Sequence, residues 1–278
     1  MRQAKLQVLG LCRWSYPSQT GAFNNTGESL EALQSELYAA GRMAVRLFFL
    51  EHLVLPSLRA QSDPDFTLVL MMGETLPEPW RSRVLELVQD VPQVKPVFLP
   101  EGQNHMVACT ALMRAHRDEN ADVVVEFRLD DDDAVASDFV AQLRGLYRQL
   151  RPIYKANKRV AVDFCRGFLF RCEDDGGVNY LPVEVRLWTP ALALYFPPDH
   201  PRSLLNYPHM RTWRSMPVLS LNKKPTFVRG AHGGNDSAIK ERKVDSFRYK
   251  LETLPSVMAS DFGVDLEAFE AAWSEVCA

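Results

Sequence analysis

Four consecutive aspartates, Asp130 to Asp133, are the residues of this chain best suited to chemistry. They follow directly after the apolar segment Val123–Leu129, whose run of valines predicts a buried strand. Carboxylates at alternate positions, such as Asp130 and Asp132, face one side where a strand gives way to a loop. Oxygen ligands placed in this way suit Mg²⁺ or Mn²⁺, which would neutralise charge on a departing diphosphate.

An acidic run also has a plainer interpretation. Most acidic runs are solvated, and negative charge near the start of a helix is mildly stabilising without any ligand. The preceding strand and the absence of a compensating lysine run favour the metal site here. An EF-hand is excluded because, counting from Asp130, the sixth position is Val135 rather than Gly and the twelfth is Ala141 rather than Glu.

A glycine-rich segment late in the chain (RGAHGGND) supplies a second group of candidates. Its glycines allow the backbone to approach a ligand closely. His232 in this segment is a suitable ligand for Mn²⁺, and the alternative is an ordinary turn with an exposed histidine. Asn235 suits hydrogen bonds to sugar hydroxyls, and Asp236 suits the role of a catalytic base.

Further candidates flank the predicted strands. Arg13 could pair with a diphosphate, and Trp14 could stack on a base, although an exposed arginine and a partly buried aromatic are equally consistent with the sequence. Arg128 alternates with Asp130 and either binds phosphate or balances the carboxylates, the second role being favoured. Asp163, on a later predicted strand, is the second candidate base after Asp236.

The elements that position these residues alternate between strand and helix in the first half of the chain. Predicted strands cover 6–12, 66–72, 94–99 and 123–129, and predicted helices cover 28–40, 43–58, 80–88, 107–115 and 138–150. This alternation predicts an α/β sheet, which binds ligands beyond the carboxyl ends of its strands. Later strands at 160–171, 184–196 and 226–229 and a helix at 266–276 predict an α+β C-terminal half, with no linker that would separate it as a second domain.

The composition excludes several classes of protein. The chain has 278 residues, a net charge of -3 and a pI near 6.1, which argue against a nucleic-acid binder held by phosphate attraction. The 5 cysteines have no CxxC spacing, which indicates a reducing compartment rather than a disulfide framework. Apolar runs are too short for a transmembrane segment or a secretory signal, so a cytoplasmic location is expected.

Two long stretches carry a family resemblance. PSLRAQSDPDFTLVLMMGE and TALMRAHRDENADVVVEFRLDDDDA resemble the first half of a family 2-like GT-A-type glycosyltransferase. Within that superfamily, RLDDDDA, RWSYP and GAHGGNDS are most similar to the rhamnosyltransferase group. The resemblance implies a GT-A-like (Rossmann-like) mixed sheet flanked by helices. Residues 1–150 would bind the nucleotide sugar and residues 151–278 the acceptor, in one continuous domain.

The resemblance also implies roles for individual residues. Asp130 and Asp132 match the ends of the family's DxD motif, with Asp133 adjacent; Asp131 and Asp133 satisfy the same spacing, so the register stays open. In this assignment the aspartates hold Mn²⁺ or Mg²⁺ against the nucleotide diphosphate, Asp131 lies in the nucleotide site, and His232 completes the metal site.

Three positions depart from the family pattern. Met71 and Met72 stand where an acidic pair normally contacts the nucleotide, for which Glu74 could substitute, and Thr110 replaces a common asparagine. The implied reaction is metal-dependent, inverting transfer of a sugar, rhamnose by resemblance alone, from a nucleotide-diphosphate sugar to an acceptor hydroxyl. The alternatives are a metal-dependent nucleotidyl or phosphoryl transferase and a non-catalytic carbohydrate-binding protein.

Overall fold

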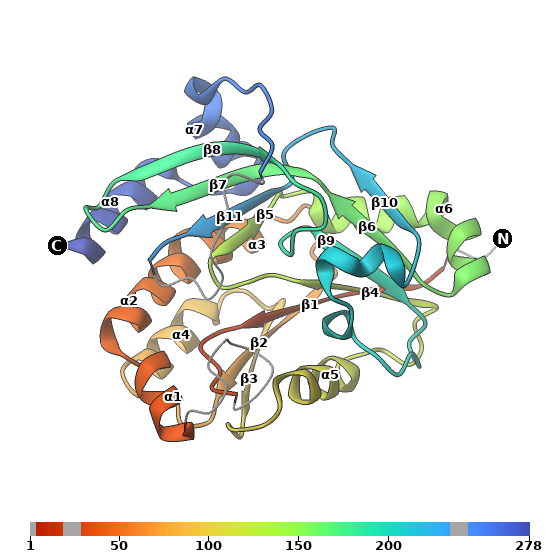
Figure 1. The fold of residues 1–278 in the computed structure, drawn as a ribbon, viewed down its shortest axis with the longest axis horizontal. Coiled ribbons are helices and arrows are strands. Elements are labelled where there is room, and N and C mark those ends of the chain that lie inside the picture. Colours follow the sequence, from red (N-terminus) through yellow and green to blue (C-terminus); the bar gives the residue numbers. More distant parts are fainter. Residues whose placement is uncertain (1–3, 19–28, 234–243) are drawn as a thin grey trace.

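A seven-stranded sheet forms the centre of the molecule, with strand order β10-β6-β9-β4-β1-β2-β3 (Figure 1). The computed structural model describes residues 4–18, 29–233 and 244–278. Neighbouring strands are parallel except where β9 pairs with β4 and β6. The strands are β1 (Leu6–Arg13), β2 (Thr67–Gly73), β3 (Val94–Leu99), β4 (Val123–Arg128), β6 (Val160–Phe164), β9 (Leu192–Phe196) and β10 (Val218–Leu221).

Helices cover both faces of this sheet because alternate strand residues face opposite apolar layers. Val8 and Cys12 of β1 belong to the layer packed against α4 and α6, whereas Leu9 and Leu11 belong to the layer packed against α5. A mixed sheet flanked by helices is the predicted fold class, which is confirmed. The main helices are α1 (Leu30–Leu37), α2 (Ala40–Phe49), α3 (Leu55–Arg59), α4 (Trp80–Val88), α5 (His105–Ala115), α6 (Phe139–Asn157), α7 (Leu254–Val257) and α8 (Leu266–Cys277).

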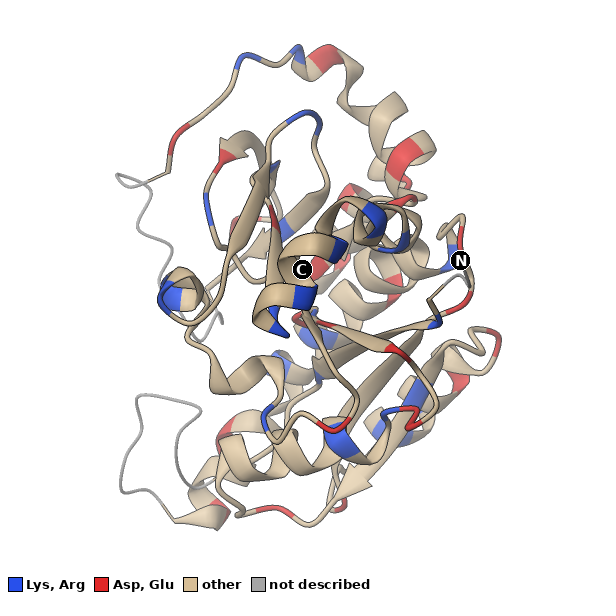
Figure 2. Cartoon of the chain, turned by 90° about the vertical axis from the view of Figure 1, so that its right-hand side faces the viewer, with Lys and Arg blue, Asp and Glu red and all other residues tan. Residues whose placement is uncertain are grey.

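Short helical turns complete the helical elements. They are the π-helical turns η1 (Leu50–Val54) and η6 (Met258–Phe262) and the 3-10 turns η2 (Leu204–Asn206), η3 (His209–Arg214) and η5 (Leu251–Thr253). None of the helices in the described part of the chain combines the length and apolar character needed to cross a bilayer. Lysine and arginine segments are interspersed with aspartate and glutamate segments in Figure 2, in keeping with the small net charge.

A second sheet, with strand order β5-β11-β7-β8, carries the end of the aspartate run. Its strands are β5 (Asp133–Val135), β7 (Arg166–Cys172), β8 (Val178–Glu184) and β11 (Phe227–Ala231). An aromatic-rich cluster joins it to α2 and α8, with Phe48 of α2 packed on Phe269 of α8 at 4.8 Å between ring centroids. Since β5 belongs to the first half of the sequence and β11 to the second, their pairing ties the two halves together at the aspartates.

Several predicted elements have the wrong extent. The predicted strand 160–171 is two strands, β6 and β7, which lie in different sheets on either side of Cys165. The predicted strand 184–196 begins where β8 ends and contains β9, again in the other sheet. Helix α6 continues past Pro152 to Asn157 because Tyr154 extends the apolar face formed by Leu150 and earlier residues.

Candidate active site

The aspartate run lies where predicted, at the carboxyl end of β4 beside the end of β1. Arg128 clamps Asp130 by donating from Nε to Oδ1 at 2.8 Å and from Nη2 to Oδ2 at 2.6 Å. Arg13 Nη2 lies 3.7 Å from Asp130 Oδ1. Burial alone would raise the pKa of Asp130, but Arg128, Arg13 and Arg229 outweigh it and lower the pKa below its usual range, so this carboxylate is ionised.

Asp131 has a different partner from its neighbours. Its Oδ1 is hydrogen-bonded to Nη1 of Arg46 on α2, and both side chains are buried. The backbone oxygen of Arg46 lies 3.5 Å from the indole nitrogen of Trp14. Because a buried charge needs its partner, this ion pair fixes the loop against α2.

Strand pairing brings His232 to the aspartates, as the family resemblance implies. β11 pairs with β5, and the Gly230 N–H donates to the backbone oxygen of Asp132 at 2.8 Å. His232 Nε2 then lies 3.5 Å from Asp132 Oδ2, and its ring stacks on Phe49 at 5.0 Å between centroids. A Cβ at Gly230 would lie only 2.5 Å from the Asp132 oxygen, so this close approach requires glycine.

Asp133 is crowded by the neighbouring carboxylates and buried. Burial raises its pKa well above the usual value, Asp132 and Asp130 raise it further, and Arg229 and Arg128 only partly oppose them. Its Oδ1 is buried without a hydrogen-bond partner among the residues that the structure describes. A buried, crowded carboxylate oxygen of this kind is a site that a cation would stabilise.

A divalent ion fits this cluster only if water or substrate phosphates supply some of its ligands. Within residues 4–18, 29–233 and 244–278, no three His, Cys, Asp or Glu side chains converge on a common metal position. Mg²⁺ is usually bound through one or two carboxylates together with water and substrate phosphates. The open oxygen of Asp133 and the neighbouring Asp132 match such an incomplete set.

Two predicted site residues are corrected by their burial. Trp14 has no exposed surface and lies in the core, so its ring cannot stack on a nucleotide base in this arrangement. Asp163 is also fully buried, and its carboxylate accepts the Leu187 N–H at 2.8 Å and the Ser220 hydroxyl at 3.0 Å. Through these hydrogen bonds, Asp163 connects β6 to Leu187 and to Ser220 of β10. Its side chain does not face an acceptor.

The remaining predicted residues are less informative. Glu74 is exposed directly after β2, and its N–H donates to the Leu99 oxygen at 3.0 Å. Asn235 and Asp236 lie outside the described residues.

Three further residues belong to the cluster that the sequence alone does not single out. Arg46 and Arg229 reach the aspartates from α2 and β11, through contacts that depend on tertiary packing and strand pairing. His209 lines a cavity of about 100 Å³ together with Arg128. Burial, with the nearby Arg128 and Arg229, lowers the pKa of His209 to about 4, so its imidazole is neutral at physiological pH.

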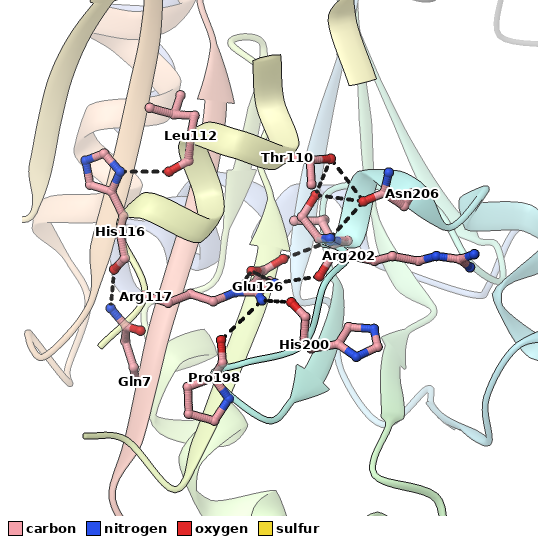
Figure 3. Close-up of polar contacts among 12 residues, drawn as sticks. Gln7, Thr110, Leu112, His116, Arg117, Glu126, Pro198, His200, Arg202 and Asn206 are labelled. Carbon is pink, nitrogen blue, oxygen red and sulfur yellow. Dashed lines mark hydrogen bonds and ion pairs between the residues drawn. The ribbon is translucent and has the colours of Figure 1, made fainter. Parts of the chain in front are cut away.

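A buried ion pair positions this cavity wall (Figure 3). Arg117 Nε donates to Glu126 Oε1 at 2.8 Å, and Glu126 Oε2 accepts the Leu204 N–H at 2.8 Å. Arg117 also donates to the backbone oxygens of Arg202, at 2.7 Å, and of Pro198, at 3.4 Å. Since Glu126 lies on β4, the pair fixes the segment before η3 to the strand that presents the aspartates.

A family model described as "Putative rhamnosyl transferase" matches residues 7–244. The chain belongs to this family of glycosyltransferases. None of the curated proteins matches it. Because the match includes both the aspartate run and His232, it covers the whole cluster described above.

Several solved structures resemble the fold distantly. A putative nucleotide-diphospho-sugar transferase from Desulfovibrio desulfuricans G20 is 12% identical with a TM-score of 0.42, and 98% of each chain is covered. S. aureus TarS 1-349 is 13% identical with a TM-score of 0.37, covering 81% of this chain and 60% of that one. The mannosyltransferase PcManGT from Pyrobaculum calidifontis, in complex with GDP-Man and Mn²⁺, is 10% identical with a TM-score of 0.40, covering 82% and 57%. With TM-scores this low, the likenesses assign no role to any residue.

Proposed function

We propose that the protein is a metal-dependent glycosyltransferase that moves a sugar from a nucleotide-diphosphate donor to an acceptor hydroxyl. The observation that carries the proposal is the group of crowded, buried carboxylates at the carboxyl ends of β1 and β4, with Asp133 Oδ1 buried and without a hydrogen-bond partner among the described residues. Family membership supports the reaction class. Rhamnose as the transferred sugar and inversion at its anomeric carbon are further parts of the proposal.

Asp132 and Asp133 are the proposed direct ligands of Mn²⁺ or Mg²⁺, with His232 and Asp130 beside them. When bound, the cation supplies positive charge to a departing diphosphate. Asp131 is assigned to the scaffold because Arg46 already holds it. We therefore propose the register Asp130 and Asp132, with Asp133 adjacent, in preference to Asp131 and Asp133.

The two arginines near Asp130 complete the electrostatics of the proposed donor site. Arg128 and Arg13 both lie beside the carboxylate of Asp130. The Nε of Arg13 is buried without a hydrogen-bond partner in the described part of the chain. Guanidinium groups bind phosphate oxygens in paired geometry, so Arg13 is assigned to the diphosphate. Asp236 remains the proposed base.

Product analysis tests this proposal against nucleotidyl transfer. The protein would be incubated with UDP-, GDP- and dTDP-linked sugars and Mn²⁺, and the released nucleoside diphosphate and sugar 1-phosphate would be measured separately. Glycosyl transfer, or hydrolysis in the absence of an acceptor, yields the intact nucleoside diphosphate. Nucleotidyl transfer from the same donor would instead leave the nucleoside monophosphate on the acceptor and release sugar 1-phosphate. Release of sugar 1-phosphate would contradict the proposal, as would activity that EDTA leaves intact.

A further inference from the structure

The segment 200–233 is strongly basic in a chain that carries a net negative charge. It contains six lysines and arginines and no aspartate or glutamate, whereas the chain as a whole has 32 basic and 35 acidic residues. The six are Arg202, Arg211, Arg214, Lys223, Lys224 and Arg229. Such local excess of one sign attracts a partner of the opposite sign over distances of about a Debye length, roughly 8–10 Å.

Two of these arginines frame exposed apolar side chains on η3. Met210 is 53% exposed and Trp213 58% exposed, whereas Thr212 between them is buried and anchors the turn. The guanidinium of Arg214 lies 5.2 Å from the centroid of the Trp213 ring. Within the described residues, neither Arg211 nor Arg214 forms an ion pair, and both are exposed. We call Met210, Arg211, Trp213 and Arg214 the η3 face.

The η3 face begins where the candidate active site ends. η3 starts at His209, which shares the wall of the cavity of about 100 Å³ with Arg128, the residue that clamps Asp130. In Figure 1 this segment is the cyan coil beside β9 and β4. Arg211, Trp213 and Arg214 belong to the same short turn as His209, so the η3 face adjoins the wall of this cavity.

We propose that the η3 face binds an anionic glycan, the acceptor whose end enters the active site; this inference rests on the proposed glycosyltransferase function. A sugar ring presents C–H groups that pack on the exposed indole of Trp213. Carboxylate or sulfate groups on neighbouring sugars form charge-assisted hydrogen bonds with the guanidinium groups of Arg211 and Arg214.

A bilayer surface fits the η3 face less well. Helices that lie in the membrane interface have a continuous apolar face. Here the apolar surface is limited to Met210 and Trp213 on a turn of 6 residues. A hydroxylated polymer with spaced negative charges matches two arginines around one aromatic ring better than acyl chains do.

Binding of defined oligosaccharides to the full chain tests the inference. The probes are oligogalacturonate, an uncharged dextran oligomer of equal length and vesicles of phosphatidylglycerol, all at low ionic strength. We expect saturable binding of oligogalacturonate, about tenfold weaker in Arg211→Gln/Arg214→Gln and several-fold weaker in Trp213→Ala. The matched control is Arg148→Gln/Lys155→Gln, which removes two exposed charges from α6 and should bind as the wild type does.

The outcomes separate this inference from the proposed function. Absence of saturable oligogalacturonate binding, equal binding of the dextran, tighter binding of the vesicles, or equal weakening in the α6 control each overturns the η3 assignment. In parallel, the thermal shift with nucleotide and Mn²⁺ should be unchanged in all of these variants. If the wild type shows no such shift, the proposed function fails whatever the glycan result.

Discussion

The aspartate run and the η3 face carry opposite charges, and they differ in how far those charges are buried and paired. Asp131, Asp132 and Asp133 are at most 5% exposed, and arginines from β4, α2 and β11 surround the run. Arg211 and Arg214 are exposed and make no ion pair in the described part of the protein. Buried carboxylates with limited compensation suit a small, hard ion held at a fixed point. Exposed arginines on a turn suit a large, variable partner that brings its own charge.

The buried pair of Arg117 and Glu126 connects these two regions, so breaking it gives the largest expected effect. Glu126→Ala leaves Arg117 buried without its counter-charge and frees the Leu204 N–H, which costs about 3–5 kcal/mol of unfolding free energy. Denaturant unfolding measures this loss. The matched control is Glu184→Ala, which removes a partly exposed partner of Arg166 and should cost about 1 kcal/mol or less. Equal losses in the two variants would contradict the linking role.

Asp132→Ala tests the acidic side of the comparison. We expect turnover with Mn²⁺ to fall by at least about a hundredfold, because charge neutralisation by a bound cation contributes several kcal/mol. Asp131→Asn is the control: it weakens the pair with Arg46 and lowers stability, but the nucleotide-dependent response to Mn²⁺ should persist. A variant of Asp132 that retains full metal-dependent turnover would place the ion elsewhere.

Gly230→Ala tests whether β11 positions the aspartates. The added Cβ would meet the backbone oxygen of Asp132 at 2.5 Å, so the strand and the loop must separate, at a cost of about 1–3 kcal/mol. Thermal and chemical unfolding measure the cost, and metal affinity should fall with it. Gly41→Ala is the control, because a Cβ there meets nothing within 4 Å and favours helix α2. Equal responses to the two substitutions would rule out the close contact.

Asp163→Asn should have the smallest effect. Burial raises the pKa of Asp163, although hydrogen bonds from Leu187 and Ser220 partly oppose it. A raised carboxyl pKa in the folded state means that this group's contribution to stability is present at low pH and is lost as the pH rises through the folded-state value. Asparagine should flatten that pH dependence, change stability at pH 7 by less than about 1 kcal/mol and leave turnover unchanged. A large loss of turnover would restore Asp163 as the catalytic base.

The sequence predicts the local elements of the molecule better than its long-range pairings. The segments 80–88 and 94–99 are found with the predicted bounds because turns and periodic apolar residues define them locally. The division of 160–171 between two sheets leaves no such signal, since both strands are apolar and the sequence does not show which strand each one pairs with.

The same distinction applies to the candidate site. The position of the aspartates after a strand follows from local pattern, and the approach of His232 follows from the family resemblance. Arg46 and His209 reach the cluster through tertiary packing, and Arg229 through the pairing of β11 with β5. The burial of Trp14 likewise depends on helix α2 covering the end of β1. Residues brought in by packing carry no spacing signal in the sequence.

Thermal stability of the wild type and of Asp130→Asn/Asp132→Asn, measured with UDP, GDP, dTDP and CDP in Mn²⁺, Mg²⁺ or EDTA, tests the central claim most directly. We predict that at least one nucleotide raises the melting temperature of the wild type only when a divalent cation is present, and that the double variant loses this increase. The absence of any metal-dependent shift in the wild type, or an equal shift in the double variant, would contradict a cation held by this aspartate cluster.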